Sequence, residues 1–323
     1  GLNSVSRTSV GRTTTPILEG ILLNVKKNSV ILTTNDLDIG MEYTLNGIET
    51  IEEGKVVIDC RMFGDIIRKL PNEQITFYVN DKNLLVIECE GSIYKLATMN
   101  ADEFPTLPNI DVEKNITISQ GALKEMIKKT IFAVSVEENR PIFTGCLIEV
   151  VNEELNVVAV DGFRLALRKA RMASGVNSFS AIVPGKYLNE IVKNLQDIDE
   201  VIEIGTSKNQ ALFELRDCKI VTRLLEGDFL NYNSVIPNEK KTRIKVSKQA
   251  LQSAIERAAI FSISASEKEK KYPIKIFVSL GSAIISCTSQ IGDAKEEVLV
   301  ETTGEELEIG FNPKYLVDAL KAI

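Results

Sequence analysis

The chain has 323 residues, of which 44% are hydrophobic and 26% charged, a balance typical of a folded globular protein with about two or three domains. Its net charge of −7 excludes a protein that holds nucleic acid over its whole surface, but permits a local basic face. Histidine is absent, which excludes every mechanism that needs a histidine base or ligand.

Predicted elements alternate between short strands and amphipathic helices. From the N-terminus, the pattern predicts a strand at 15–25, a helix at 62–70, and alternating strands at 75–79 and 84–89. A strand that leads into a serine and an apolar-striped helix follows at 115–131, where Ser119 is placed to cap the helix. Short strands joined by tight turns predict antiparallel hairpins with helices packed on one face, an α+β fold.

The later part of the chain repeats these elements. Ser247 stands before a second striped helix as Ser119 stands before the first, at an offset of 128 residues. The helix that begins at Met62 returns at Tyr187 after 125 residues and at Tyr315 after a further 128. One offset held across separate elements predicts three tandem copies of one domain.

We place the three predicted domains at 1–114, 115–241 and 242–323. The first copy lacks the capped start of its opening helix, and the third stops directly after its second helix. Half a domain would expose its core face and a sheet edge, so we expect a longer parent protein. No apolar run reaches the ~20 residues that cross a bilayer, and no secretory signal is visible, so we also expect a cytoplasmic protein without membrane contact.

No motif indicates catalysis. The chain has no glycine-rich phosphate loop, and its five cysteines stand singly, a pattern typical of reduced structural thiols rather than of a zinc site. Asp36 and Asp38 suggest a carboxylate metal site, but surface acids at a strand end are favoured because no further acids stand at ligand spacing. We therefore expect no catalytic residue, no metal and no cofactor.

Each copy of the recurring helix has a carboxylate three residues before a base. One explanation is an i, i+3 ion pair on a solvated face, which contributes about 0.2–0.5 kcal/mol. The other is that three related domains direct equivalent bases at one ligand, together with lysines of the helix after Ser119. The residues concerned are Asp65 with Arg68, Glu190 with Lys193, Asp318 with Lys321, and Lys124, Lys128 and Lys129.

Three segments, together with the tandem copies, carry a resemblance to a known family. They are Gly11–Leu23, Ala159–Leu167 and Ile309–Leu316. In these segments, and in the order and spacing of its elements over nearly the whole chain, the sequence resembles the bacterial sliding clamps, the beta subunits of DNA polymerase III. The resemblance implies a non-catalytic homodimer that closes into a ring around double-stranded DNA without reading its sequence. It further implies partners that bind as short peptides, among them the polymerase alpha subunit and the clamp loader.

The resemblance also implies site residues. Those expected to contact DNA are Arg12, Arg68, Lys128, Lys193 and Lys321. The expected peptide-binding cleft comprises Phe143, Val160, Gly162, Phe163, Arg164, Leu165, Leu230, Val235, Asn312 and Tyr315, although Val160, Leu165 and Val235 would also suit an ordinary core. The expected dimer interface joins Tyr94 of one subunit to Ile260 and Phe261 of the other.

Two other functions compete with a processivity clamp. A repeat-built scaffold would bind protein partners without encircling DNA, and charge reversal at Arg68, Lys193 and Lys321 separates the two because only a clamp needs those bases. A carboxylate-dependent hydrolase or phosphotransferase would need acids that converge from several segments, and the sequence indicates none.

Overall fold

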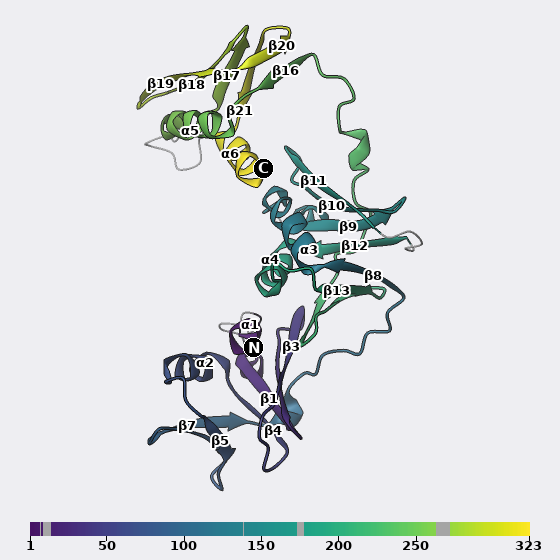
Figure 1. The fold of residues 1–323 in the computed structure, drawn as a ribbon, viewed down its shortest axis with the longest axis vertical. Coiled ribbons are helices and arrows are strands. Elements are labelled where there is room, and N and C mark those ends of the chain that lie inside the picture. The colour runs from purple at the N-terminus through teal and green to yellow at the C-terminus, as the bar shows by residue number, and fades with distance from the viewer. Residues whose placement is uncertain (7, 9–13, 138, 173–177, 263–271) are drawn as a thin grey trace. The chain divides into compact units, whose positions relative to one another are not determined.

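The computed structural model describes residues 1–323 except 7, 9–13, 138, 173–177 and 263–271 (Figure 1). The chain divides into two compact units. The first comprises Gly1–Asp161 and Ala166–Phe229, and the second comprises Gly162–Leu165 and Leu230–Ile323. Both have the expected α+β composition, and no helix in the described ranges is long and apolar enough to span a membrane.

The first copy of the repeat opens the first unit. Its helices are α1 (Leu2–Val5) and α2 (Cys60–Lys69), with 3₁₀ turns η1 (Pro16–Glu19) and η2 (Ala101–Glu103). Its strands are β1 (Gly20–Lys26), β2 (Ser29–Asn35), β3 (Ile39–Asn46), β4 (Gly54–Asp59), β5 (Thr76–Val79), β6 (Leu84–Cys89) and β7 (Ser92–Met99).

The second copy completes the first unit. Its helices are α3 (Gln120–Lys128) and α4 (Gly185–Asn194), which pack against each other, with 3₁₀ turns η3 (Ile131–Ala133) and η4 (Pro141–Thr144). Its strands are β8 (Lys114–Ser119), β9 (Gly145–Val151), β10 (Glu154–Val160), β11 (Leu165–Arg171), β12 (Phe179–Pro184), β13 (Val201–Thr206), β14 (Gln210–Glu214) and β15 (Cys218–Arg223).

The two copies share one sheet. Strand β3 of the first copy pairs antiparallel with β15 of the second, with Met41 opposite Ile220. This joint gives an 11-stranded sheet in the order β5-β6-β7-β4-β1-β2-β3-β15-β14-β13-β8, and a second sheet has the order β11-β10-β9-β12. One continuous cluster of buried apolar side chains runs through both copies, so they form a single packed body.

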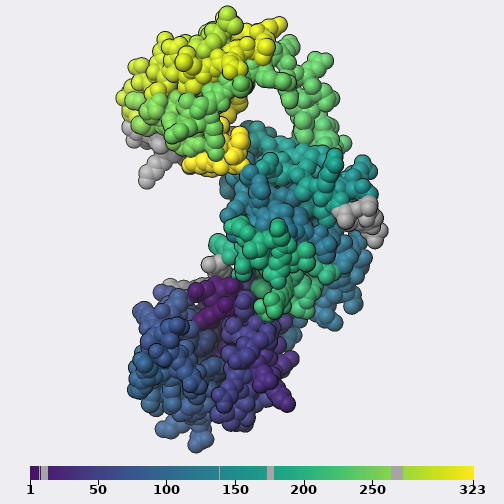
Figure 2. Space-filling model, in the orientation of Figure 1, coloured from purple at the N-terminus to yellow at the C-terminus, as the bar shows by residue number. Residues whose placement is uncertain are grey.

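The third copy makes up most of the second unit and is the green and yellow part of Figure 2. Its helices α5 (Lys248–Ala258) and α6 (Pro313–Ala322) pack against each other, and η5 (Tyr232–Ser234) and η6 (Ala259–Ser262) are short 3₁₀ turns. Its strands are β16 (Thr242–Lys245), β17 (Ile274–Ser279), β18 (Ser282–Ser289), β19 (Gly292–Leu299), β20 (Glu301–Gly304) and β21 (Leu307–Phe311). A separate core forms between these helices and the β19-β18-β17-β21 sheet.

Strand pairing confirms the three-copy prediction at the level of single residues. The sheets β3-β2-β1-β4, β11-β10-β9-β12 and β19-β18-β17-β21 have the same order. Equivalent hairpins also keep the same register: the paired residues are Leu23 with Leu32, Ile148 with Val157, and Ile276 with Ile285. Successive pairs are displaced by the same 125 and 128 residues that relate the recurring helices. Because a slip of one residue would turn every side chain to the opposite face, this agreement fixes the same core side in each copy.

The predicted helix starts are confirmed by their caps. The hydroxyl of Ser119 accepts a hydrogen bond from the amide of Ala122 at 3.3 Å, and that of Ser247 accepts one from Ala250 at 3.4 Å. Each hydroxyl satisfies a backbone donor that has no partner within its helix.

Candidate functional site

The bases of the recurring helix occupy equivalent positions. Arg68, Lys193 and Lys321 lie exposed in the last turns of α2, α4 and α6. A cation at a helix C-terminus is favoured by the helix dipole, so this placement also has a purely structural benefit. In the first two copies the expected i, i+3 ion pairs are present: Arg68 lies 2.6 Å from Asp65, and Lys193 lies 2.6 Å from Glu190.

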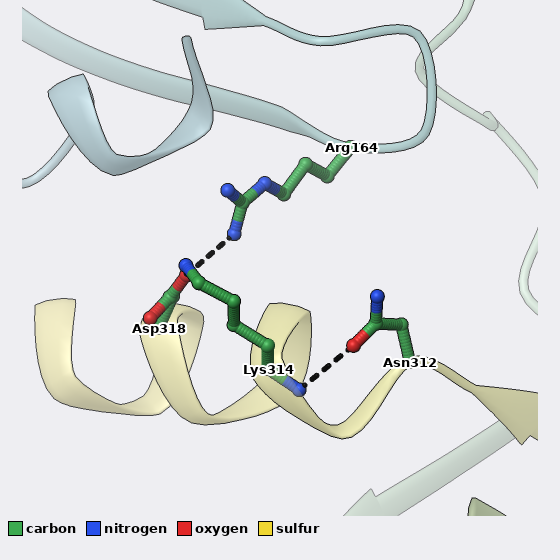
Figure 3. A network of polar contacts seen from close by, with 4 residues as sticks. All are labelled: Arg164, Asn312, Lys314 and Asp318. Atoms are coloured by element: carbon green, nitrogen blue, oxygen red, sulfur yellow. Dashed lines mark hydrogen bonds and ion pairs between the residues drawn. The ribbon is translucent and has the colours of Figure 1, made fainter. Parts of the chain in front are cut away.

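The third ion pair differs from the prediction. The ion-pair explanation places Asp318 with Lys321, but the Asp318 carboxylate accepts hydrogen bonds from Arg164 at 2.8 Å and from Lys314 at 2.6 Å (Figure 3). Lys321 instead lies 3.9 Å from Glu256 on α5. The i, i+3 ion-pair explanation is therefore wrong for the third copy, because a guanidinium from a distant segment and a lysine one turn earlier bind the Asp318 carboxylate.

The lysines of α3 and of its C-terminal cap differ in how far neighbouring acids neutralise their charge. Lys124 donates to Asp197 at 2.9 Å, and Lys129 lies 2.8 Å from Glu125. Lys128 is exposed at the end of the same helix. The remaining predicted base, Arg12, lies outside the described residues.

A four-residue turn, Gly162–Leu165, belongs to the second unit although it lies where β10 leads into β11, and its last residue is the first of β11. In this turn Gly162 has a φ of 93°, a conformation that strains any residue with a Cβ. The Phe163 side chain is 81% exposed, with its ring centroid 6.2 Å from that of Tyr315 on α6. The guanidinium of Arg164 lies 4.3 Å from the centre of the same tyrosine ring, a cation–π geometry.

Arg164 is held from two sides. Its side chain is 15% exposed and that of Asp318 is 20% exposed, so their 2.8 Å ion pair is largely shielded from water. Burial alone would raise the pKa of Asp318, but hydrogen bonds from Arg164 and Lys314 outweigh it and the pKa is lowered. Asn312 has a local role, since its side-chain oxygen caps α6 by accepting from the amide of Lys314 at 3.0 Å (Figure 3).

The other residues of the expected cleft fall into two groups. In the second unit, Leu165 is half-buried, while Leu230 and Val235 are exposed, so Val235 is not a core residue. Phe143 and Val160 belong to the first unit. There Phe143 packs edge-on against Phe229 with ring centroids 6.1 Å apart, whereas Val160 is buried as the end of β10.

The residues expected at a subunit interface lie beside open sheet edges. Strand β7, which contains Tyr94, pairs with β6 along its length but with β4 only at its last two residues. Strand β19 ends the sheet of the second unit, so within the described ranges it has one partner, β18. Phe261 is half-buried beside Gly292 at the start of β19, and the neighbouring Ile260 is 64% exposed.

Little in the described part of the chain resembles a catalytic or metal centre. No group of three or more cysteine, aspartate or glutamate side chains there could hold a metal ion. Asp36 is engaged in its own turn, where its carboxylate accepts from the amides of Asp38 and Ile39. All five cysteines are buried thiols, and burial raises the pKa of Cys146 to about 12, which disfavours a thiolate nucleophile.

No pattern in the sequence indicates that Asp318 binds both Arg164 and Lys314. The spacing within the recurring helix indicated only the pairing of Asp318 with Lys321. The one available signal is the arginine within the Ala159–Leu167 motif, but its distance in sequence from α6 gives no indication of contact.

Comparison with known families covers nearly the whole chain. Models of the DNA polymerase III beta subunit match in order: the N-terminal domain at residues 1–108, the central domain at 117–231 and the C-terminal domain at 233–323. The beta sliding clamp of Bacillus subtilis is 35% identical over 321 residues, which cover 97% of this chain and 84% of that protein. The beta sliding clamp of Halalkalibacterium halodurans is 34% identical over 336 residues, which cover 100% and 87%.

Comparison with solved structures indicates the same family. A putative DNA polymerase III beta subunit from Eubacterium rectale superposes with a TM-score of 0.93 at 32% identity, covering 100% of this chain and 87% of that one. The sliding clamp of Pseudomonas aeruginosa bound to griselimycin gives 0.93 at 30% identity, covering 100% and 86%. The chain therefore belongs to the DNA polymerase III beta subunit family, the bacterial beta sliding clamps.

Proposed function

We propose that this protein is a sliding clamp that encircles duplex DNA as a homodimeric ring and gives DNA polymerase III its processivity. The observation that carries the proposal is the three-fold repeat, whose strand register is the same in every copy, in a chain that belongs to the clamp family. Two subunits supply six such domains. We keep 1–114, 115–241 and 242–323 as the proposed domain boundaries and the cytoplasm as the proposed location.

DNA contact is assigned to Arg12, Arg68, Lys128, Lys193 and Lys321. Support for the last four comes from their exposure on helices. Arg68 and Lys193 are partly neutralised by their neighbouring acids, so their attraction to phosphate is weak. Weak contact with phosphates, without recognition of the nucleotide sequence, suits a protein that must move along DNA, because encirclement rather than affinity keeps the protein on the DNA.

Partner binding is assigned to the predicted cleft, centred on Phe163, Arg164 and Tyr315. An exposed aromatic ring beside a second ring provides an apolar anchor point for a peptide side chain. Griselimycin binding by the Pseudomonas aeruginosa relative makes that compound a suitable probe. The proposed occupants are short segments of the polymerase alpha subunit, the clamp loader and other clamp-binding proteins.

The proposed subunit interface joins Tyr94 to Ile260 and Phe261 of the partner. The open edges of β7 and β19 support it, because two strands that each have one open edge can complete each other's backbone hydrogen bonds. Such pairing would also remove two edges that otherwise favour aggregation.

A processivity measurement tests the proposal. DNA polymerase III and its clamp loader are given a long primed circular template, with excess competitor template to limit synthesis to one binding event. We expect this protein to lengthen the products strongly, and the variant with Arg68, Lys193 and Lys321 changed to glutamate to lose most of that effect. Products of equal length with and without the wild-type protein would refute the proposal.

A further inference from the structure

The three copies provide an internal comparison for one carboxylate. Asp65 and Glu190 each bind the base three residues later on their own helix, at 2.6 Å. Asp318, at the equivalent place in α6, instead binds Arg164 and Lys314. We infer that Asp318 is a positioning residue for partner binding, one that acts only through Arg164. The inference rests on the proposed peptide-binding function of the cleft and adds a residue to it.

The contacts of Arg164 explain how Asp318 would act. The guanidinium lies between the Asp318 carboxylate, 2.8 Å away, and the face of the Tyr315 ring, 4.3 Å from its centre. Asp318 and Tyr315 are three residues apart on α6 and therefore share one face of the helix. The arginine thus ties the Gly162–Leu165 turn to α6 at two points.

Loss of the carboxylate would release one of these points. A hydrogen bond between charged groups is stronger than a neutral one and has a fixed direction, whereas a cation–π contact tolerates many orientations. Without Asp318, the guanidinium and the neighbouring Phe163 would sample more positions. A ligand would then have to order them on binding, which costs affinity.

Asp318 also determines the charge that a ligand meets. Its carboxylate neutralises Arg164, and its second donor, Lys314, points to the same oxygen. The surface beside Phe163 and Tyr315 therefore presents ring faces rather than a free cation. This favours an apolar ligand group at this point over an acidic one.

The test is a double-mutant cycle read by fluorescence anisotropy of labelled griselimycin. Its variants are Asp318→Ala, Arg164→Ala and the double variant, with Asp65→Ala as the matched control from the first copy. We expect Asp318→Ala to weaken binding roughly tenfold, and the double variant to bind within about twofold of Arg164→Ala alone, because Asp318 has no separate effect. Asp65→Ala is expected to bind like the wild type.

Two further measurements keep the outcomes distinct. Thermal unfolding of each variant, together with the isosteric Asp318→Asn, identifies any loss that comes from misfolding, and Asp318→Asn should weaken binding as Asp318→Ala does. Wild-type affinity for Asp318→Ala, or losses that add in the double variant, would overturn the inference while leaving the clamp proposal intact. A wild-type protein that increases processivity but does not bind griselimycin would overturn the cleft assignment and this inference together.

Discussion

Removal of the charges of Asp65 and Glu190, the acids beside Arg68 and Lys193, should raise the affinity of the protein for duplex DNA. Asp65 lies 2.6 Å from Arg68, and the hydrogen bond from Arg68 lowers the pKa of the Asp65 carboxyl, so this acid is charged at neutral pH and opposes the base. Glu190 lies equally close to Lys193. The double variant Asp65→Asn, Glu190→Gln keeps both bases and both side-chain shapes but removes the two competing charges.

The size of the effect follows from counterion release. Each phosphate neutralised on duplex DNA adds about 0.9 to the slope of log affinity against log salt concentration. Two released bases therefore predict a slope steeper by up to about 1.8 per subunit. Affinity should rise most at low salt and converge with that of the wild type as salt increases.

The assay is anisotropy of a short labelled linear duplex over a series of salt concentrations. A matched control is Glu301→Gln, Glu308→Gln, which changes the net charge equally. These exposed acids pair with Lys245 and Lys275, which lie on strands of the second unit. An unchanged slope in the test variant, or an equal increase in the control, would refute the assignment of Arg68 and Lys193 to DNA contact.

Three other outcomes are expected. Leu188→Ala on α4 should lower the free energy of unfolding by about 2–5 kcal/mol because this side chain is fully buried. Leu280→Ala, at a position 90% exposed, should change that free energy by less than about 0.5 kcal/mol. Urea unfolding of the two variants compares them, and similar unfolding midpoints would contradict the packing described. Griselimycin affinity should stay constant between about pH 5 and 8, since the chain has no histidine. The pKa of Asp318 is lowered, so the contribution of its carboxylate to binding is lost only as the pH falls below the ordinary carboxyl range. A clear transition in affinity between about pH 5 and 8, measured by anisotropy, would contradict this prediction. Gly162→Ala should weaken griselimycin binding roughly fivefold, since its φ of 93° strains a Cβ, and an unchanged dissociation constant would show that the turn conformation is not needed.

Much of the fold was predictable because local chemistry and repetition agree in this chain. Ser119 and Ser247 indicated helix starts by a rule that depends on neighbouring residues alone, and the caps are present. The 125-residue offset between Met62 and Tyr187 also holds for the strand register, because equivalent hairpins bury the same face.

The parts that could not be predicted are contacts between distant segments. Helical spacing identified Lys321 as a neighbour of Asp318, but not the competing Arg164, which lies 154 residues earlier. Similarly, alternation predicted strands but not that β3 would pair with β15 and merge two copies into one sheet. Pairing between strands of different repeats depends on how whole domains meet, which residue patterns do not encode.

Encirclement is the central claim, and topology tests it most directly. The protein is loaded onto a nicked circular plasmid by a bacterial clamp loader and isolated by gel filtration, and the plasmid is then cut once with a restriction enzyme. We predict that the protein stays with the closed circle and leaves soon after the cut by sliding off the new ends. Release at the same rate from cut and uncut plasmid would contradict the account.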